Sequence, residues 1–357
     1  ISKTINMNFM FNDCSSLNYL NLSSFQGSLL KNSMDYMFLG CTNLTSIDFH
    51  NLDISNTVKV KRIFNGCYNL QYLNLSNSRA DNNDLSYMFN NMKKLISIDL
   101  SNFSGSSINT SMEYMFDNCQ NLIELDLSAF IFSPWNMDHM FSGCSSLKYL
   151  NLSRLNYSYN KIFSSMFNDC INLEILDISN FKGSLVENKM DFMFSNCRKF
   201  ISFSFPSLNL VNTTNISYIF NGCISLTSIL INSLFETYIT DLSYMLNDCI
   251  SLRYVNFSNF KTSNKINNKM EYMFKNCQNL TSIDFPFLDI SFTIDHQSIF
   301  KFCDNIHYLN LSYLKADYIS NLSYLFSDKK SLISIDLSNF KGPVIDNTLV
   351  GMFFNCN

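Results

Sequence analysis

The chain of 357 residues is poor in charge, because Asp, Glu, Lys and Arg make up only 15% of it and the formal net charge is -4. Its Lys and Arg do not cluster, so the basic patch expected of a nucleic-acid-binding protein is missing. No apolar run approaches the roughly 18 to 20 residues of a membrane span, so we expect no span in this segment. The chain starts at Ile1 without an initiator Met or a signal-peptide pattern, which indicates a removed leader or a fragment of a longer chain.

The motifs of conventional active sites are also missing. The sequence has no Gly-rich phosphate loop and no nucleophile elbow. It has no Cys-x-x-Cys pair or Cys/His cluster that would predict a zinc site. The four histidines occupy unrelated positions: His50, His139, His296 and His307. We therefore expect no catalytic residue, no metal site and no cofactor, and a protein that is not an enzyme.

What the sequence does contain is one motif repeated along its whole length, clearest in SMEYMFDNCQNLIELDLSAF from Ser111 to Phe130. Its Phe, taken as position 0, recurs with spacings of 25 to 28 residues. The fourteen landmarks are Phe11, Phe38, Phe64, Phe89, Phe116, Phe141, Phe167, Phe194, Phe220, Leu246, Phe274, Phe300, Phe326 and Phe353. Such a unit buries its apolar face only by stacking on its neighbours. The repeat thus predicts a single continuous solenoid over residues 1–357.

The pattern within one repeat predicts an α/β solenoid of about 14 rungs, each with one short helix and one short parallel strand. Met112, Met115 and Phe116, at positions -4, -1 and 0, share one face of a short helix. Asn, Asp or Ser at position -5 can cap its start, and Gly, Asn or Asp at +2 can adopt the left-handed conformation that ends it. Leu125 and Leu127 then alternate as in a strand, which places positions +8 and +10 on the outward face.

The full pattern, M-x-x-M-F-x-x-C-x-x-L-x-x-L-x-L-S-x-F, resembles the repeat of the BspA-like leucine-rich-repeat surface proteins of bacteria, mycoplasmas and some protists. The resemblance covers the whole chain and implies a solenoid with a parallel sheet on one side and a role in cell-surface adhesion or interaction. Because that family is defined by scaffold residues, the resemblance carries over no catalytic residue. Departures are local: Leu246 replaces the Phe, and Ser204 and Leu230 replace the strand Asn or Asp.

All twelve cysteines lie at position +3, in a column that only Met92 and Lys329 interrupt. The apolar Met92 favours a buried column of reduced thiols without disulfides. A rung separation of about 4.8 Å also falls within the range that disulfides allow, so scattered disulfides stay an alternative. The column consists of Cys14, Cys41, Cys67, Cys119, Cys144, Cys170, Cys197, Cys223, Cys249, Cys277, Cys303 and Cys356.

The outward strand positions form the candidate binding face, because tyrosine beside amides and carboxylates suits polar ligands such as glycans or peptides. Its residues are Tyr19, Asn21, Tyr72, Asn74, Asp99, Asp126, Tyr149, Asn151, Asp177, Tyr254, Asn256, Tyr308 and Asn310. The favoured interpretation is nevertheless structural, with Asn and Asp columns hydrogen-bonding along the solenoid and keeping the face soluble. Calcium binding by the Asp positions is a minor alternative. A second tyrosine column at position -2 can stack outside the core or provide a contact surface.

These patterns predict a non-enzymatic extracellular or cell-surface scaffold whose partners are proteins or glycans. A self-assembling fibre or coat, and an adhesion receptor that uses the strand face, are the alternatives. If a eukaryote secretes the chain, N-glycosylation is expected at sequons in the variable crossings: Asn109, Asn156, Asn212, Asn215 and Asn321.

Overall fold

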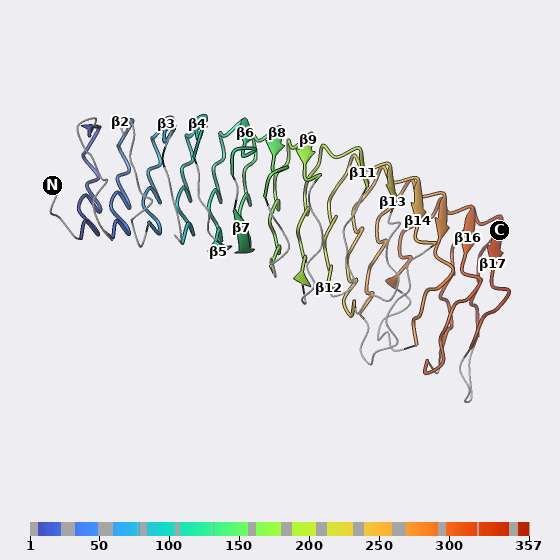
Figure 1. Cartoon of the computed structure of the whole chain (residues 1–357). Helices are drawn as coiled ribbons and strands as arrows, with labels where there is room; N and C mark the ends of the chain where they lie inside the picture. The colour runs from blue at the N-terminus through green and yellow to red at the C-terminus, as the bar shows by residue number, and fades with distance from the viewer. Residues whose placement is uncertain are drawn as a thin grey trace. The chain divides into compact units, whose positions relative to one another are not determined.

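The computed structural model of the protein describes residues 6–22, 33–48, 60–76, 78, 84–103, 108–130, 132–155, 162–179, 188–204, 213–230, 239–258, 269–291, 298–319, 321–342 and 349–356. The chain forms two compact units, Ile1–Lys182 and Gly183–Asn357. Figure 1 traces both units from the N-terminus to the C-terminus. Whether the whole chain is one continuous solenoid stays a prediction.

In the first unit, three-residue parallel strands lie where the sequence predicts them, at positions +8 to +10. Leucine or isoleucine at +9 points into the core, and the strand is short because the chain turns on both sides of it. Pairing joins β1 to β2, β3 to β4, and β6 to β8 and β9. The strands are β1 (Tyr19–Asn21), β2 (Ser46–Asp48), β3 (Tyr72–Asn74), β4 (Ser97–Asp99), β6 (Glu124–Asp126), β8 (Tyr149–Asn151) and β9 (Ile175–Asp177).

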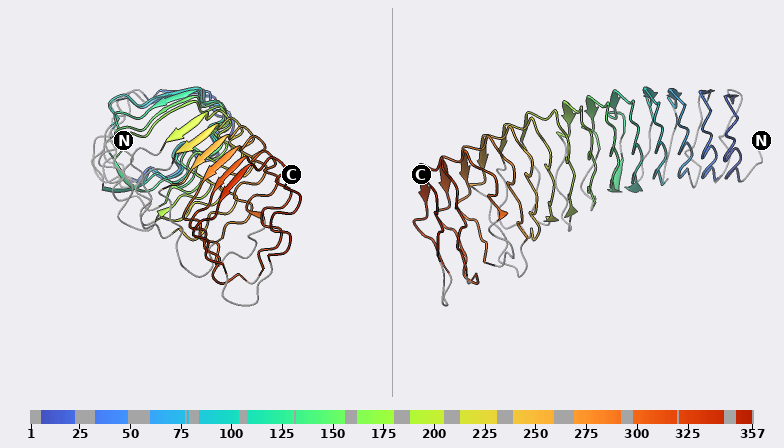
Figure 2. Two further views of the ribbon diagram at one scale, coloured as in Figure 1. Left: turned by 90° about the vertical axis from the view of Figure 1, so that its right-hand side faces the viewer. Right: turned by 180° about the vertical axis from the view of Figure 1, so that it is seen from behind.

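In the second unit, the same strand positions form one six-stranded parallel sheet in the order β11-β13-β14-β15-β16-β17. Its arrows lie side by side in Figure 2. Equivalent residues pair throughout, so each repeat position forms a column across the sheet. The strands are β11 (Ser202–Ser204), β13 (Ser228–Leu230), β14 (Tyr254–Asn256), β15 (Ser282–Asp284), β16 (Tyr308–Asn310) and β17 (Ser334–Asp336). The predicted solenoid of parallel strands is thereby confirmed in each unit.

A second set of parallel strands forms where the chain returns from one rung to the next. In the first unit β5 (Ile108–Ser111) pairs with β7 (Ser133–Asn136), and in the second β10 (Asn188–Lys189) pairs with β12 (Thr213–Asn215). Both pairings contain register shifts, because the crossings differ in sequence from rung to rung. The sequence pattern did not predict these strands.

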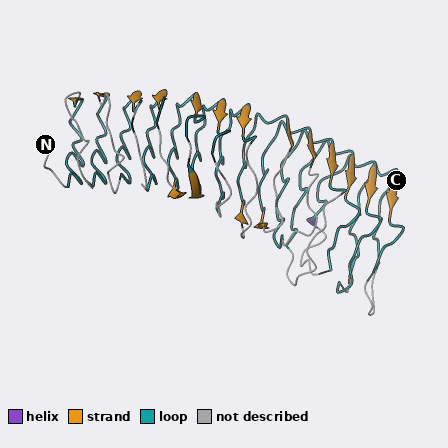
Figure 3. Cartoon of the chain, in the orientation of Figure 1, coloured by secondary structure: helices purple, strands orange, loops and turns teal. Residues whose placement is uncertain are grey.

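The predicted helix in each rung is wrong, since the described residues contain no α-helix and, apart from a 3-10 turn at Ser298, consist of strands joined by turns (Figure 3). In an α-helix every amide would donate to the carbonyl four residues earlier. Here the amide of Met115 donates to Met112 O at 3.2 Å, three residues back, whereas the amide of Phe116 donates to Met140 O of the next rung at 2.8 Å. Amides alternate in this way between closing a turn and joining the next rung. The i, i+3, i+4 spacing of buried residues is therefore produced by successive turns.

Two left-handed residues in each rung prevent a helix from forming. Tyr114 at position -2 has φ 53° and Asn118 at position +2 has φ 58°, and the same two positions are left-handed in most other rungs. A positive φ at the third residue is the requirement of a type II turn. The left-handed conformation predicted at +2 is confirmed, but the one at -2 was not foreseen, because tyrosine rarely adopts it.

The core lies between the strands and the turns. The position 0 phenylalanines stack on one another, with ring centroids of consecutive rungs 4.9 to 6.1 Å apart in the first unit. In the second unit, neighbouring phenylalanine rings of this column have centroids 5.4 to 5.7 Å apart. Met112, Met115, Cys119 and Leu122 of the example repeat are fully buried around this stack. Each rung thus completes its neighbour's core, as stacking repeats require.

Candidate functional site: the exposed strand face

The strand face is defined here as the side chains at positions +8 and +10 of the paired strands. In β3, Tyr72 is exposed, Leu73 is buried and Asn74 is half-buried, as the period of two demands. Tyr19 and Tyr72 are the most exposed candidates, at 58% and 59%. All thirteen candidate residues lie at the strand positions expected of them. The structure locates them without testing whether they bind anything.

The sheets bring only some of these candidates together. In the first unit, Tyr149 pairs with Glu124 on one side and Ile175 on the other, and Asn151 lies between Asp126 and Asp177. In the second unit, Tyr254 and Tyr308 are separated by Ser282 of β15. Tyr149 thus lies between an acidic and an aliphatic neighbour, whereas Tyr254 and Tyr308 flank a serine.

The Asn and Asp side chains at position +10 form hydrogen bonds mainly within their own rung, whereas the favoured interpretation from sequence placed these hydrogen bonds along the solenoid. Their Oδ1 atom accepts a hydrogen bond from the backbone amide two residues later, at 2.7 to 3.2 Å, which closes a turn at the end of the strand. The residues are Asn74, Asp99, Asp126, Asn151, Asp177, Asn256, Asn310 and Asp336. The second oxygen or amide nitrogen of each is left for other partners, and Asn310 Nδ2 donates to Asp284 Oδ1 at 2.6 Å.

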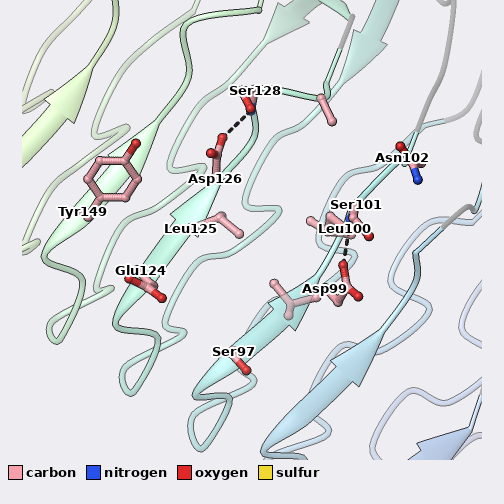
Figure 4. Close-up of a pocket in the computed structure, with 12 residues that line it drawn as sticks. Ser97, Asp99, Leu100, Ser101, Asn102, Glu124, Leu125, Asp126, Ser128 and Tyr149 are labelled. Atoms are coloured by element: carbon pink, nitrogen blue, oxygen red, sulfur yellow. Dashed lines mark hydrogen bonds between the residues drawn. The ribbon is translucent and has the colours of Figure 1, made fainter.

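One hollow of about 630 Å³ lies on this face where β4, β6 and β8 adjoin. Figure 4 shows Asp99, Glu124 and Asp126 together with Tyr149 around it, with Ser128 and Ser101 donating their amides to the two aspartates. Three carboxylates and one phenol give the hollow a negative potential. A ligand that presents amide, hydroxyl or cationic donors suits it chemically.

The cysteine column lies in the core, with most of its thiols fully buried and Cys14 and Cys356 half-buried. Thiols of this column donate to the carbonyl oxygen of the position 0 residue one rung earlier, at 2.8 to 3.3 Å. Burial raises the pKa of the Cys41 thiol to about 11 and that of Cys223 to about 12. Thiolate formation is disfavoured at neutral pH, so these groups are poor nucleophiles.

The candidate glycosylation sites are only partly described. Asn215 is half-buried and Asn321 is exposed, and both accept a backbone amide through Oδ1 at 2.8 Å. Asn109 lies in β5, and its side chain is outside what the structure describes. Asn156 and Asn212 lie outside the described residues. Glycosylation of all five stays a prediction.

The side chains at position -5 cap the turn in place of the predicted helix. Their Oδ1 atoms accept the backbone amide of position -3 at 2.8 to 3.0 Å, which confirms that they cap free amides. The residues are Asp84, Asn136, Asn215, Asp241 and Asn321. The local chemistry was predicted correctly even though the element was not.

A second surface, which sequence reasoning placed on a helix, is formed by flat side chains at position -2. We call it the planar ladder: Phe9, Tyr36, Arg62, Tyr87, Tyr114 and His139 in the first unit, and Phe192, Tyr218, Tyr244 and Tyr272 in the second. Neighbouring rings stack with centroids 4.4 to 5.1 Å apart. The guanidinium carbon of Arg62 lies 4.3 Å from the Tyr87 ring centre, so Arg62 is a rung of the same ladder. The recurring tyrosines signalled this column, but the participation of Arg62 and His139 was missed.

Polar groups around the planar ladder are coupled to it. Tyr87 Oη donates to Glu113 Oε1 at 3.2 Å. Burial, followed by the negative charge of Asp138, raises the pKa of Tyr114 to about 12. Behind the rings, Asn90 Nδ2 donates to Asp117 Oδ2 at 2.8 Å, and burial raises the pKa of that carboxyl. Since the pKa values of Tyr87 and Tyr114 are raised, these two side chains are neutral at physiological pH and serve as stacking and hydrogen-bonding groups.

Two features, a metal-binding cluster and a membrane-spanning helix, are absent from the described residues. These residues contain no group of three or more His, Cys, Asp or Glu side chains arranged to hold a metal ion. They also contain no helix long and apolar enough to cross a membrane.

One protein family matches the sequence, that described as "Mycoplasma protein of unknown function, DUF285". The matches together span the chain from end to end, at residues 1–77, 32–148, 83–204, 110–233, 188–308 and 268–357. No curated protein matches the chain.

Solved structures of leucine-rich-repeat proteins resemble the fold. A leucine-rich repeat protein from Bacteroides ovatus ATCC 8483 matches with a TM-score of 0.53 at 16% identity, over 95% of this chain and 78% of that one. A leucine rich cell surface protein from Faecalibacterium prausnitzii A2-165 matches at 14% identity with a TM-score of 0.28, over 80% of this chain and 84% of that one. The first similarity shows a leucine-rich-repeat fold, and the second is too weak to support a conclusion.

Proposed function

We propose that this chain, which belongs to the DUF285 family, is a non-enzymatic interaction scaffold that acts outside the cell or at its surface. We further propose that it is a BspA-like protein whose strand face binds a polypeptide partner. The observation that carries the proposal is the acidic hollow on β4, β6 and β8, which Asp99, Glu124, Asp126 and Tyr149 line. In it the parallel pair β6-β8 adjoins β4, which is paired with β3.

The geometry favours binding over catalysis at this hollow. The two aspartates are each fixed by a backbone amide, from Ser101 at 2.9 Å and from Ser128 at 2.7 Å. Oriented carboxylates that do not have to be reorganised are suited to hold amide and ammonium groups of a ligand. A basic segment of a partner protein presents both kinds of donor.

The test is binding of the full chain to an array that carries basic, acidic and neutral peptides beside glycans. We expect selective retention on basic peptides, and a loss of at least tenfold in affinity for the double variant Glu124→Gln/Tyr149→Ser. Tyr318→Ser serves as the control, since Tyr318 is 73% exposed and belongs to no strand. If the double variant binds the basic peptides with the same affinity as the wild type, the proposed site is disproved.

The two alternative functions, an adhesion receptor and a self-assembling fibre or coat, are tested with the same purified full chain. Selective retention on glycans would favour the adhesion receptor that recognises carbohydrate. Concentration-dependent growth of large species in light scattering would favour the self-assembling fibre or coat. Extracellular location is tested separately, by protease treatment of intact cells that express the protein. Loss of the protein from intact cells on protease treatment is the result expected of an extracellular location.

A further inference from the structure

The planar ladder of the second unit has a missing rung. Tyr272 and Tyr324 occupy position -2 in two repeats, and the repeat between them carries Ser298 at that position. Phe192 stacks on Tyr218 at 4.4 Å and Tyr218 on Tyr244 at 4.5 Å, and Tyr272 lies 5.1 Å from Tyr244 with its ring tilted by 33°. A serine has no ring to continue the stack, so the ladder is interrupted between two tyrosines.

The interruption coincides with a cavity of about 500 Å³ on the turn side of the rungs. Tyr272 and Tyr324 both line it, and Lys301 and Phe302 contribute further lining. Ser298 also lines it, is only 3% exposed, and accepts the backbone amide of Tyr272 through Oγ at 3.0 Å. The missing rung thus leaves a walled space on the protein.

The rung spacing sets the width of this slot. Two steps at about 4.8 Å separate Tyr272 from Tyr324 by roughly 9.6 Å. A single ring placed midway would lie about 4.8 Å from each neighbour, which is within the 4.4 to 4.8 Å at which parallel rings of the ladder stack elsewhere. The slot therefore has the width of one flat ring, and aromatic rings stack favourably at such distances.

The charged side chains around the slot indicate which charge a ligand should carry. The ammonium groups of Lys275 and Lys301 lie 5.0 and 5.7 Å from the centre of the Tyr272 ring, and that of Lys301 also lies 5.3 Å from the Phe302 ring. On the opposite wall, Asp328 accepts a hydrogen bond from Asn355 at 2.8 Å. The cavity lining as a whole is mixed, with Asp304 and Asp328 beside Lys301 and Lys329. The two ammonium groups near the Tyr272 ring make that wall the one to which an anionic group of a ligand would be attracted.

We propose that this slot binds the aromatic side chain of a partner polypeptide, with an acidic residue next to that side chain in the sequence. The ring fills the place of the missing rung between Tyr272 and Tyr324, and the carboxylate pairs with Lys301 or Lys275. This site lies apart from the acidic hollow and does not depend on the function proposed for the strand face.

The experiment measures the affinity of the full chain for blocked dipeptides by saturation-transfer NMR. N-acetyl-Asp-Tyr-amide is the probe, and N-acetyl-Asp-Leu-amide, N-acetyl-Lys-Tyr-amide and methyl β-glucoside are the comparisons. We expect the Asp-Tyr probe to bind at least tenfold more tightly than the other three. Equal binding of the Leu probe, or tighter binding of the glucoside, would overturn the assignment of an aromatic ligand.

Two variants locate the binding on the protein. Ser298→Tyr supplies the missing ring and is expected to abolish binding of the Asp-Tyr probe, whereas Ser165→Tyr makes the same change at position -2 in the first unit and leaves binding intact. Tyr324→Leu removes one wall and is expected to weaken binding at least fivefold, which tests the site even if Ser298→Tyr does not fold. Unchanged binding by the folded Ser298→Tyr variant, or by Tyr324→Leu, would overturn the proposal.

Discussion

The strand face and the turn face of each rung satisfy their backbone groups in different ways. On the strand face, equivalent residues pair register for register across parallel strands, as Leu150 does with Leu125. On the turn face, which spans positions -4 to +3, each second amide closes a turn within its own rung and the others reach the next rung. The strand face is thus held by ordinary pairing, whereas the turn face depends on residues that tolerate a left-handed backbone.

The two faces also use their recurring polar and aromatic columns differently. On the strand face, the Asn and Asp at position +10 close turns, while four of the five tyrosines at +8 are exposed and Tyr149 is half-buried. On the turn face, the tyrosines at -2 stack on one another. A regular column is therefore largely engaged in holding the repeat together. Ligand binding is to be sought where a column is exposed or broken, at the acidic hollow and at Ser298.

The largest effect is expected from the core that both faces share. Phe116→Ala removes a fully buried ring from the position 0 stack, so we expect a loss of about 3 to 5 kcal/mol in the free energy of unfolding. Phe116→Leu should cost clearly less, because Leu246 occupies the same repeat position and is fully buried. Urea unfolding followed by circular dichroism measures both. Equal losses for the two variants would show that leucine recovers none of the stabilisation and that the stacked ring itself is required at this position.

Left-handed positions on the turn face should give the next largest effect. A Cβ at Gly66, where φ is 75°, meets no atom closer than 3.6 Å, so Gly66→Ala should cost only the conformational term of about 1 to 2 kcal/mol. A Cβ at Gly222 would collide with Asn196 Oδ1, so Gly222→Ala should cost about 1 kcal/mol more. Thermal unfolding of both variants tests the difference. Neutral substitutions at both positions would contradict the proposed dependence of the turn face on left-handed residues.

The contrast between the faces also explains which parts of the fold the sequence predicted. Alternation of buried Leu125 and Leu127 with exposed Glu124 and Asp126 has a period of two, which only a strand produces, so the strand face was predicted residue by residue. The spacing of Met112, Met115 and Phe116 on the turn face is shared by helices and by successive turns. Tertiary hydrogen bonds to the next rung decide between them, and no single repeat contains that information.

The candidate site was predicted less completely than the fold. Sequence alone identified Tyr149 and Asp126 as outward-facing, because both belong to regular columns. It could not identify the hollow, because the carboxylate of Glu124 departs from the Tyr and Ser that alternate at that position. The slot at Ser298 was missed for the same reason, since it is defined by the absence of a ring from a column that was thought to lie on a helix.

A smaller effect on stability is expected on the strand face, where the side chains at position +10 close turns and the tyrosines at position +8 do not. Asp126→Ala removes the acceptor for the Ser128 amide, which lies 2.7 Å away, so we expect a loss of about 1 kcal/mol. Asp126→Asn keeps an Oδ1 acceptor, as Asn151 does in the next strand, and should be nearly neutral. Tyr149→Ser should leave stability unchanged. Urea unfolding of the three variants decides this, and a stability loss in Tyr149→Ser larger than that in Asp126→Ala would reverse the roles assigned to the two columns.

The smallest effect concerns the one buried carboxyl of the turn face whose pKa is raised. Asp117 is 7% exposed, and burial raises its pKa despite hydrogen bonds from Asn118 and Asn90. Because the folded-state pKa lies above the unfolded value of about 3.9, the carboxyl contributes its stability below that value and loses it as the pH rises through the folded pKa. Asp117→Asn should therefore be more stable than the wild type at pH 7, with a gain that shrinks towards pH 4. Asn90 shows that asparagine fits this repeat position. The measurement is the urea midpoint of both proteins between pH 4 and 7, with the exposed Asp126→Asn as the control, and a gain that does not change with pH would assign the effect to packing and not to ionisation.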